Sequence, residues 1–274
     1  PMLNWPLTVA LVLVCIPGIV VTMPRLINTF QTTIESRMRP GQRPPAQSTL
    51  AAVSIAQNLI IVSIAAAIGT ALAPRVGLRA PFFEALILGG PLWAAFTQQV
   101  LPALVAGTSG ALLFVAAYYR IFRPRLDDLN LRTMEALRMR LGAGSRLLYG
   151  GIVEEVISRW GLMSLLVWVG TLLFGGPSPF VIWTAIVVTG VFFGLGHLPG
   201  HLAAGGRITP WLIGAMIGLN LWASLIFGWL FWQVGLLAAM LAHMLFHLVW
   251  LPFEYRHVQP TGNALTNLWS NGEK

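Results

Sequence analysis

Residues 147–174 read LLYGGIVEEVISRWGLMSLLVWVGTLLF, and this stretch decides the fold class. A transmembrane helix needs about 20 consecutive, mostly apolar residues, and the stretch is longer than that. Within it only Glu154, Glu155 and Arg159 carry charge. A charged side chain at the centre of a bilayer costs about 2.5–3.5 kcal/mol on insertion scales. The stretch therefore predicts a membrane-spanning helix whose charged residues have a structural or chemical purpose.

The composition of the whole chain agrees with a membrane protein. Of its 274 residues, 56% are hydrophobic and 9% are charged, and the mean hydropathy is +0.74. A soluble domain usually carries about 25% charged residues. The net charge of +8 comes from arginines that lie between the apolar runs, where the positive-inside rule places them. Membrane topology therefore explains the charge, and we expect a lipid bilayer rather than a nucleic acid as the partner.

Further apolar runs predict the remaining spans. Single spans are expected at residues 7–23, 48–72 and 180–198, and two more within residues 208–253. The first run is expected to be retained, because no Lys or Arg precedes it as in a signal peptide. Residues 85–119 are uncharged and broken by Gly-Gly-Pro, so they form either a half-helix and one span or two short spans. The prediction is an all-α, polytopic membrane helix bundle of seven or eight transmembrane helices.

The arginines predict an orientation for a bundle of seven spans. If the chain changes side at every span, one side receives the arginines of residues 25–43 and 120–146 together with Arg207 and Arg256. Only Arg75 and Arg79 then lie opposite. The arginine-rich side should be cytoplasmic. We therefore expect a cytoplasmic C-terminus and an integral protein of the plasma (inner) membrane.

Spacing gives the two adjacent acids of the opening stretch different tasks. Glu155 and Arg159 are four residues apart, in the acid-before-base order that favours pairing on a helix. Glu154 points about 100° away from Glu155 on an α-helix and lacks this partner. We therefore expect Glu154 to be the carboxylate that is free for chemistry.

Three histidines lie in later spans. His243 and His247 are four residues apart on one helix face, and His197 ends a span shortly before Pro199. A carboxylate beside imidazoles is suited to general-base activation of water. The set of Glu154, His197 and His243 would also suit zinc, if a metal is bound. Simpler interpretations are a structural ion network, hydrogen-bonded core histidines, or a haem site.

The three clusters, in this order, resemble the motifs of a membrane protease family. They are Glu154-Glu155-Val-Ile-Ser-Arg159, Phe193-Gly-Leu-Gly-His197 and His243-Met-Leu-Phe-His247. The CAAX protease and bacteriocin-processing (CPBP) family, which includes the type II CAAX prenyl proteases, has the patterns Glu-Glu-x-x-x-Arg, Phe-x-x-x-His and His-x-x-x-Asn. The resemblance covers roughly residues 120–252.

This resemblance implies an intramembrane endopeptidase that hydrolyses a peptide or protein substrate at or in the membrane, lipidated or not. Glu154 would activate water with the help of His197. His243 and His247 would polarise the scissile carbonyl and stabilise its oxyanion. Whether a metal takes part stays open. The supporting residues would be Glu155 and Arg159, which orient their helix, and Phe193.

Two positions depart from the family pattern. Ser158 stands where the family often has Phe, which we interpret as a packing change. His247 stands where the family usually has Asn. An asparagine amide donates a hydrogen bond at any pH, whereas the charge and tautomer of a histidine depend on its surroundings. The departure at residue 247 therefore bears directly on activity.

These inferences divide the chain into four segments. They are N-terminal transmembrane helices (1–119), an amphipathic cytoplasmic-side segment (120–146), catalytic transmembrane helices (147–253) and a polar C-terminal tail (254–274).

Two other functions remain open. Gly107-Thr-Ser109-Gly110 is similar to the Gly-x-Ser-Gly of rhomboid serine proteases, with Ser109 and His243 as a dyad. Against it, no histidine precedes His197. The alternative from another class is a non-proteolytic membrane protein, either a transporter, a haem or metal binder, or a degenerate family member that acts as a scaffold.

Overall fold

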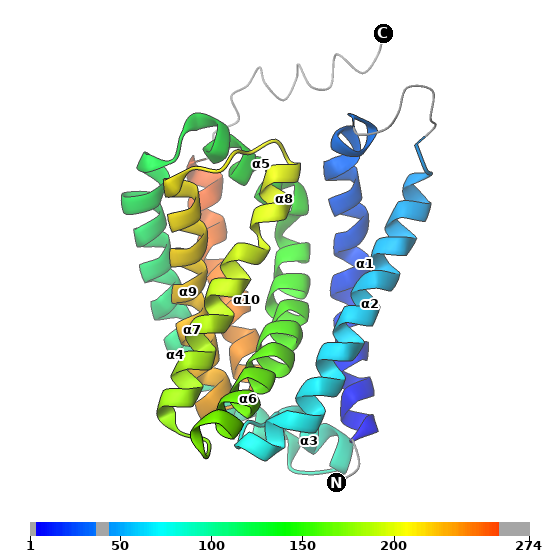
Figure 1. The fold of residues 1–274 in the computed structure, drawn as a ribbon, viewed down its shortest axis with the longest axis vertical. Coiled ribbons are helices and arrows are strands. Elements are labelled where there is room, and N and C mark those ends of the chain that lie inside the picture. Colours follow the sequence, from blue (N-terminus) through cyan, green and yellow to red (C-terminus); the bar gives the residue numbers. More distant parts are fainter. Residues whose placement is uncertain (1–3, 37–43, 258–274) are drawn as a thin grey trace.

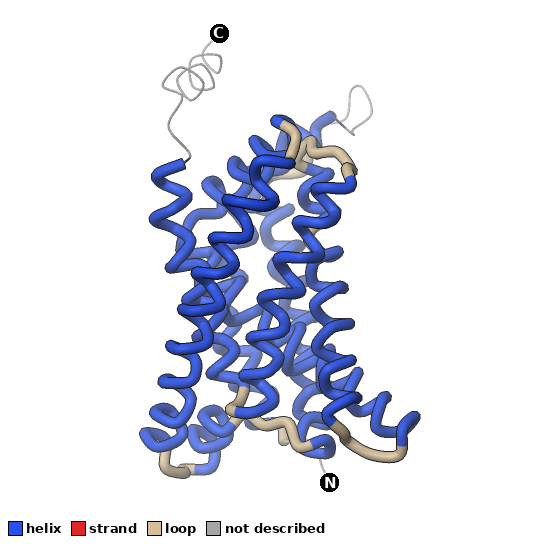
Figure 2. The backbone as a smooth tube through the Cα atoms, turned by 90° about the vertical axis from the view of Figure 1, so that its left-hand side faces the viewer, coloured by secondary structure: helices blue, strands red, loops and turns tan. Residues whose placement is uncertain are grey.

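The computed structural model describes residues 4–36 and 44–257, which form helices joined by short connections (Figures 1 and 2). Seven of the described helical segments are long and apolar enough to cross a membrane. The predicted all-α, polytopic bundle is therefore confirmed, with seven spans. Most of the predicted tail, residues 258–274, lies outside the described residues, as do residues 37–43 of the arginine-rich connection.

Of the first three spans, two pack together at one side of the bundle, and the third packs against the last two spans. Helices α1 (Trp5–Ser36) and α2 (Gln47–Leu72) pack along each other at one side (Figure 1). A 3-10 turn, η1 (Ala73–Val76), and the short α3 (Pro81–Leu88) follow at the end where α1 begins. Helix α4 (Leu92–Ala117) then returns as the third span.

The uncharged run at residues 85–119 resolves into a short helix and one span. Helix α3 has eight residues, which at 1.5 Å per residue cannot cross the hydrocarbon core. Gly89 ends it with a φ of 69°, a left-handed conformation that glycine adopts at little cost. This local backbone reversal is why the bundle has seven spans and not eight.

A polar segment follows the third span. It comprises η2 (Tyr118–Phe122), η3 (Arg123–Arg125) and α5 (Asp128–Ser145). Helix α5 is broken at Gly142, whose φ of 70° is non-helical. Six of the thirteen described arginines lie in this segment, at the end of the bundle opposite η1 with its Arg75 (Figure 1). The described chain thus has the charge asymmetry on which the predicted orientation depends.

The fourth span contains the two adjacent acids and is not a regular α-helix. Its first two parts, η4 (Arg146–Glu154) and η5 (Val156–Met163), are wound as π-helices, and α6 (Ser164–Phe174) completes the crossing. Such wider turns are rare and frequently occur at functional sites. The span lies between the α1–α2 pair and the last two spans.

Three more spans close the bundle. Helix α7 (Pro179–Gly196) is followed by the short α8 (Leu198–Ala203), and then by the antiparallel helices α9 (Pro210–Gln233) and α10 (Leu236–His257). A turn at Gly235 joins the last two helices.

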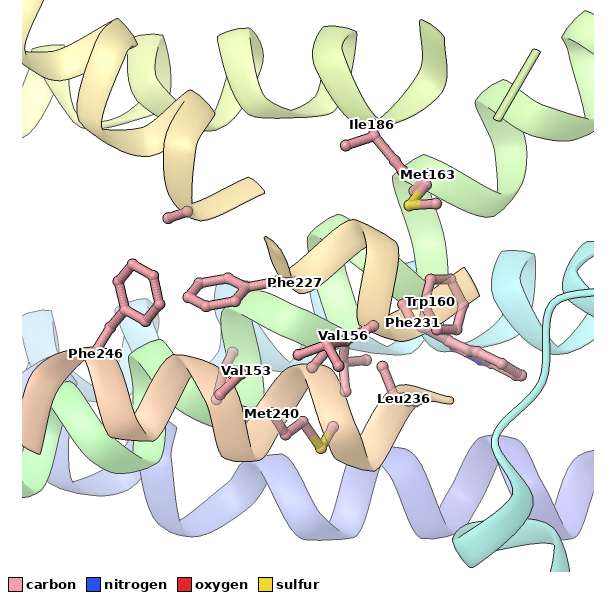
Figure 3. Packing of buried hydrophobic residues seen from close by; sticks show 14 of the residues in the cluster. Val153, Val156, Trp160, Met163, Ile186, Phe227, Phe231, Leu236, Met240 and Phe246 are labelled. Carbon is pink, nitrogen blue, oxygen red and sulfur yellow. The ribbon is translucent and has the colours of Figure 1, made fainter. Parts of the chain in front are cut away.

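Close helix contacts and a buried core hold the last spans together. A Cβ atom added to Gly190 would lie 2.7 Å from Cβ of Ser224, so this glycine allows α7 to approach α9. Side chains of the fourth span, α9 and α10 meet in the core, as Figure 3 shows around Phe227. The ring of Phe227 lies 4.8 Å from that of Phe246, in an edge-on arrangement.

Candidate active site

The two adjacent acids of the fourth span lie in different surroundings. Oε2 of Glu155 lies 3.3 Å from Nε of Arg159, and both side chains are fully buried. The side chain of Glu154 keeps 23% of its exposure and lines an internal cavity. The π-helical winding therefore retains the predicted contact between residues four apart and leaves Glu154 facing the cavity.

Arg159 is enclosed by aromatic rings. Its guanidinium carbon lies 5.8 Å from the ring centre of Phe193 and 5.7 Å from that of Phe227, which come from α7 and α9. A desolvated guanidinium is attracted to the face of an aromatic ring. Phe193 thus contacts the ion pair that anchors the fourth span, as a supporting residue would.

His243 connects the two acids. Its Nδ1 lies 2.8 Å from Oε1 of Glu155, so Nδ1–H donates to that carboxylate. Its Nε2 lies 3.9 Å from Oε2 of Glu154. The imidazole stacks on the ring of Phe227, with centres 4.7 Å apart. Glu155 and Phe227 therefore fix the ring so that its second nitrogen faces Glu154.

His247 lies one turn further along α10. Its ring stacks on that of His243 with centres 5.0 Å apart and an angle of 29° between the planes. A Cβ atom added to Gly150 would lie 2.6 Å from Nε2 of His247 and 3.6 Å from Nε2 of His243. Gly150 precedes Glu154 by four residues, so a position without a side chain gives both imidazoles access to the segment that carries Glu154.

His197 lies at the end of α7, where it is exposed and lines the same cavity. Its Nδ1–H donates to the carbonyl oxygen of Phe193 across 2.7 Å. This bond leaves Nε2 as the acceptor of a neutral ring. The ring of Phe193 lies 4.9 Å from His197 and 6.1 Å from His243, so it packs near both imidazoles.

The four predicted residues share one cavity of about 640 Å³. Glu154, His197, His243 and His247 are among its lining residues, which come from most of the spans, including α1. The walls are mainly apolar, and such concave, mainly apolar sites with few polar groups are typical of binding sites. The cavity has room for a segment of peptide chain beside the free carboxylate.

The predicted metal-ligand set does not come together. Within residues 4–36 and 44–257, no three His, Cys, Asp or Glu side chains are grouped closely enough to hold a metal ion. Glu154 and His243 approach each other, but Nδ1 of His197 is bound to the carbonyl oxygen of Phe193 in its own helix. The placement of these side chains therefore does not fit a three-ligand zinc site.

The interpretation of Gly107-Thr-Ser109-Gly110 as a nucleophile motif is wrong. Ser109 is exposed on the outside of α4, and its hydroxyl donates to the carbonyl oxygen of Val105 in the same helix. It does not line the cavity that contains His243. The glycines serve packing, since a Cβ atom on Gly107 would lie 2.9 Å from Cα of Ala242 in α10.

Two polar networks next to the cavity were not predicted from the sequence. In one, Glu254 near the end of α10 pairs with Arg138 and Arg146. In the other, Nε2–H of the buried His201 donates to Oδ1 of Asn130 across 2.8 Å. For the network of Glu254, the available sequence signal was an acid near the end of a mainly apolar helix.

The chain was also compared with known proteins. Residues 140–249 match the model of a family described as type II CAAX prenyl endopeptidase Rce1-like. The matched segment contains all three motifs and confirms the resemblance predicted from them. No curated protein and no solved structure matches the chain. The family match supports a CAAX-type intramembrane protease in general terms.

Proposed function

We propose that this chain is an intramembrane endopeptidase of the CAAX type, and that Glu154 activates the attacking water. One observation carries the proposal. The cavity-facing carboxylate of Glu154 lies 3.9 Å from Nε2 of His243, whereas the adjacent Glu155 is bound to both Arg159 and His243. Glu154 is thus free to exchange a proton with water in an apolar cavity, where a carboxylate is an effective base.

Peptide hydrolysis needs a base, an oxyanion donor and an acid, and protein groups supply all three. Glu154 takes one proton from water as the water oxygen attacks the scissile carbonyl carbon. His247, whose ring stacks on that of His243, stabilises the negative charge that develops on the carbonyl oxygen. Protonated Glu154 then delivers its proton to the nitrogen as the C–N bond breaks. The products are a carboxylic acid and a free amine.

His197 has a separate part in this scheme. Its Nδ1–H is bound to the carbonyl oxygen of Phe193, so its Nε2 can accept a hydrogen bond from water or from a substrate N–H. We propose that it helps to hold the attacking water at the exposed rim of the cavity. This role needs only a hydrogen-bond acceptor on the ring.

The substrate is a peptide or protein at or in the bilayer, with or without a lipid. Residues 147–253 contain the proposed catalytic side chains. Helix α1, one of the N-terminal helices, also lines the cavity. We propose that the protein lies in the plasma (inner) membrane. Its arginine-rich end, which includes residues 120–146, then faces the cytoplasm together with the C-terminus.

A cleavage assay tests the proposal. Purified wild type, Glu154→Gln and Ser109→Ala are reconstituted in liposomes with quenched fluorescent peptides, one bearing a prenylated cysteine and one without lipid. Wild type and Ser109→Ala should cleave, whereas Glu154→Gln should lose about 10²–10⁴-fold in rate because the base is removed. A chelator should leave the wild-type rate unchanged.

Normal turnover by Glu154→Gln would defeat the mechanism. Loss of activity in chelator, restored by zinc, would show that a metal completes the site. Folded wild-type protein that cleaves neither peptide would favour the scaffold alternative, to which the histidine at position 247 points.

A further inference from the structure

His247 marks the departure from the family pattern, and its ring has a charged neighbour. The Nε–H of Arg146 donates to Nδ1 of His247 across 3.4 Å. The two residues are 101 positions apart in the chain and lie on η4 and α10. The contact therefore depends on the packing of the fourth span against the last.

Arg146 is also fixed by an ion pair with Glu254. Glu254 pairs with Arg146 and with Arg138, whose Nε lies 2.6 Å from Oε1 of the carboxylate. The side chains of Glu254 and Arg146 keep only 2% and 6% of their exposure. Both guanidiniums also lie over the ring of Trp250, at 4.5 Å for Arg138 and 5.6 Å for Arg146. Arg146 thus has little freedom to turn away from His247.

This arrangement selects one tautomer of His247. A guanidinium can only donate hydrogen bonds, so the nitrogen that faces it must accept. Nδ1 of His247 therefore keeps its lone pair, and the single proton of the neutral ring is on Nε2. A second proton at Nδ1 would have to displace Arg146. Nε2 lies beside Gly150, whose missing side chain leaves this edge of the ring open to the cavity.

We infer that Arg146 is a positioning residue that makes His247 a permanent hydrogen-bond donor toward the cavity. The inference rests on the proposed function, because the donor would serve the oxyanion of the scissile carbonyl. An asparagine amide offers its N–H without any choice of tautomer. A histidine offers Nε2–H reliably only when Nδ1 is occupied by a donor. The Arg146–Glu254 pair is therefore what allows a histidine to stand in the place of asparagine.

Imidazole ¹⁵N spectra of the full chain test the tautomer directly. The protein is labelled with ¹⁵N-histidine in detergent micelles, and the signals of His247 are assigned by their loss in His247→Gln. The expected signature is a protonated Nε2 and an unprotonated Nδ1. A protonated Nδ1 in the wild type would overturn the inference, and this readout needs neither activity nor an Arg146 variant.

A double-mutant cycle tests the positioning role. Arg146→Met is introduced into the wild type and into His247→Asn, with Arg123→Met as the control, because Arg123 pairs with Glu135 away from His247. Arg146→Met should lower kcat about tenfold in the wild type, less than the 10²–10³-fold typical for loss of an oxyanion donor. In His247→Asn the same change should cost less than about twofold, because the amide needs no tautomer selection.

The outcomes separate this inference from the proposed function. Equal losses of kcat in both backgrounds would show a merely structural role and overturn the inference. If Arg146→Met also shifts the ¹⁵N signature of His247 while Arg123→Met does not, the positioning role holds. An Nε2–H tautomer in a chain that cleaves neither peptide would leave the positioning role intact and defeat the protease proposal alone.

Discussion

Glu154 and Glu155 are adjacent in the chain, yet the side chain of Glu155 is fully buried whereas that of Glu154 keeps 23% of its exposure. Arg159 and His243 both converge on Glu155, so this acid joins the fourth span to α10. Glu154 has no comparable partner and faces the cavity. The two carboxylates should therefore differ in what their loss does to the protein.

Glu155→Gln should destabilise the fold, whereas Glu154→Gln should not. Loss of the Glu155 charge leaves Arg159 as a buried, unpaired cation, which costs about 3–5 kcal/mol. Glu154→Gln should change the free energy of unfolding by less than about 1 kcal/mol, in line with substitutions outside such networks. Denaturant unfolding in detergent, followed by tryptophan fluorescence, measures both. Equal stability of the two variants would contradict this division.

Arg159→Ala should lower stability and yield, for the converse reason. It strands the buried Glu155 and removes the cation between Phe193 and Phe227, and the expected loss is again about 3–5 kcal/mol. The matched control is Arg79→Ala, since the Arg79 side chain is 71% exposed and its pair with Glu84 is therefore worth less than about 1 kcal/mol. Unfolding curves of the two variants that coincide would show that the buried pair stabilises nothing.

Gly150→Ala should reduce catalysis more than stability. The added methyl would lie 2.6 Å from Nε2 of His247 and would push this ring from its place in the cavity wall. We expect kcat to fall about tenfold or more, since displacement by 1 Å can cost about 10²-fold. Gly214→Ala is the control, because nothing lies within 4 Å of its added Cβ. Unchanged kcat in Gly150→Ala would show that the ring position is not required.

Local spacing predicted much of this site. The seven spans follow from the lengths of the apolar runs, and the pair of Glu155 with Arg159 follows from their four-residue separation. Contacts within one helix depend on helical geometry alone, which a sequence reveals. The three motifs also indicated that Glu154 and the imidazoles share a cavity, as they do.

Contacts between helices that are far apart in the sequence could not be predicted from residue spacing. Arg146 and Glu254 are 108 positions apart, and their meeting depends on how η4 and α10 are rotated about their axes. In a bilayer the lipid-facing and the buried sides of a helix are both apolar, so the sequence pattern does not reveal that rotation.

Asn130→Ala should loosen the arginine-rich end of the bundle. The Asn130 side chain is buried, donates to Asp127 across 2.7 Å and accepts from Nε2 of His201 and from the backbone N–H of Arg207. Each buried polar group left without its partner costs about 1–3 kcal/mol. The melting temperature should fall clearly, whereas Asn28→Ala, at an exposed position, should leave it unchanged. Similar melting temperatures of the two variants would rule out a joining role for Asn130.

His197→Ala should stop cleavage while the bundle stays folded. The residue is exposed at the end of α7, so its truncation removes little packing, but it lines the cavity and offers Nε2 to water. His257 at the end of α10 is a close control, because it is exposed too and its Nδ1–H donates to the carbonyl oxygen of Phe253 across 2.8 Å. His257→Ala should cleave at the wild-type rate, since His257 does not line the cavity. Cleavage by His197→Ala at the rate of His257→Ala, with equal melting temperatures, would remove His197 from the mechanism and leave Glu154 to hold the water without it.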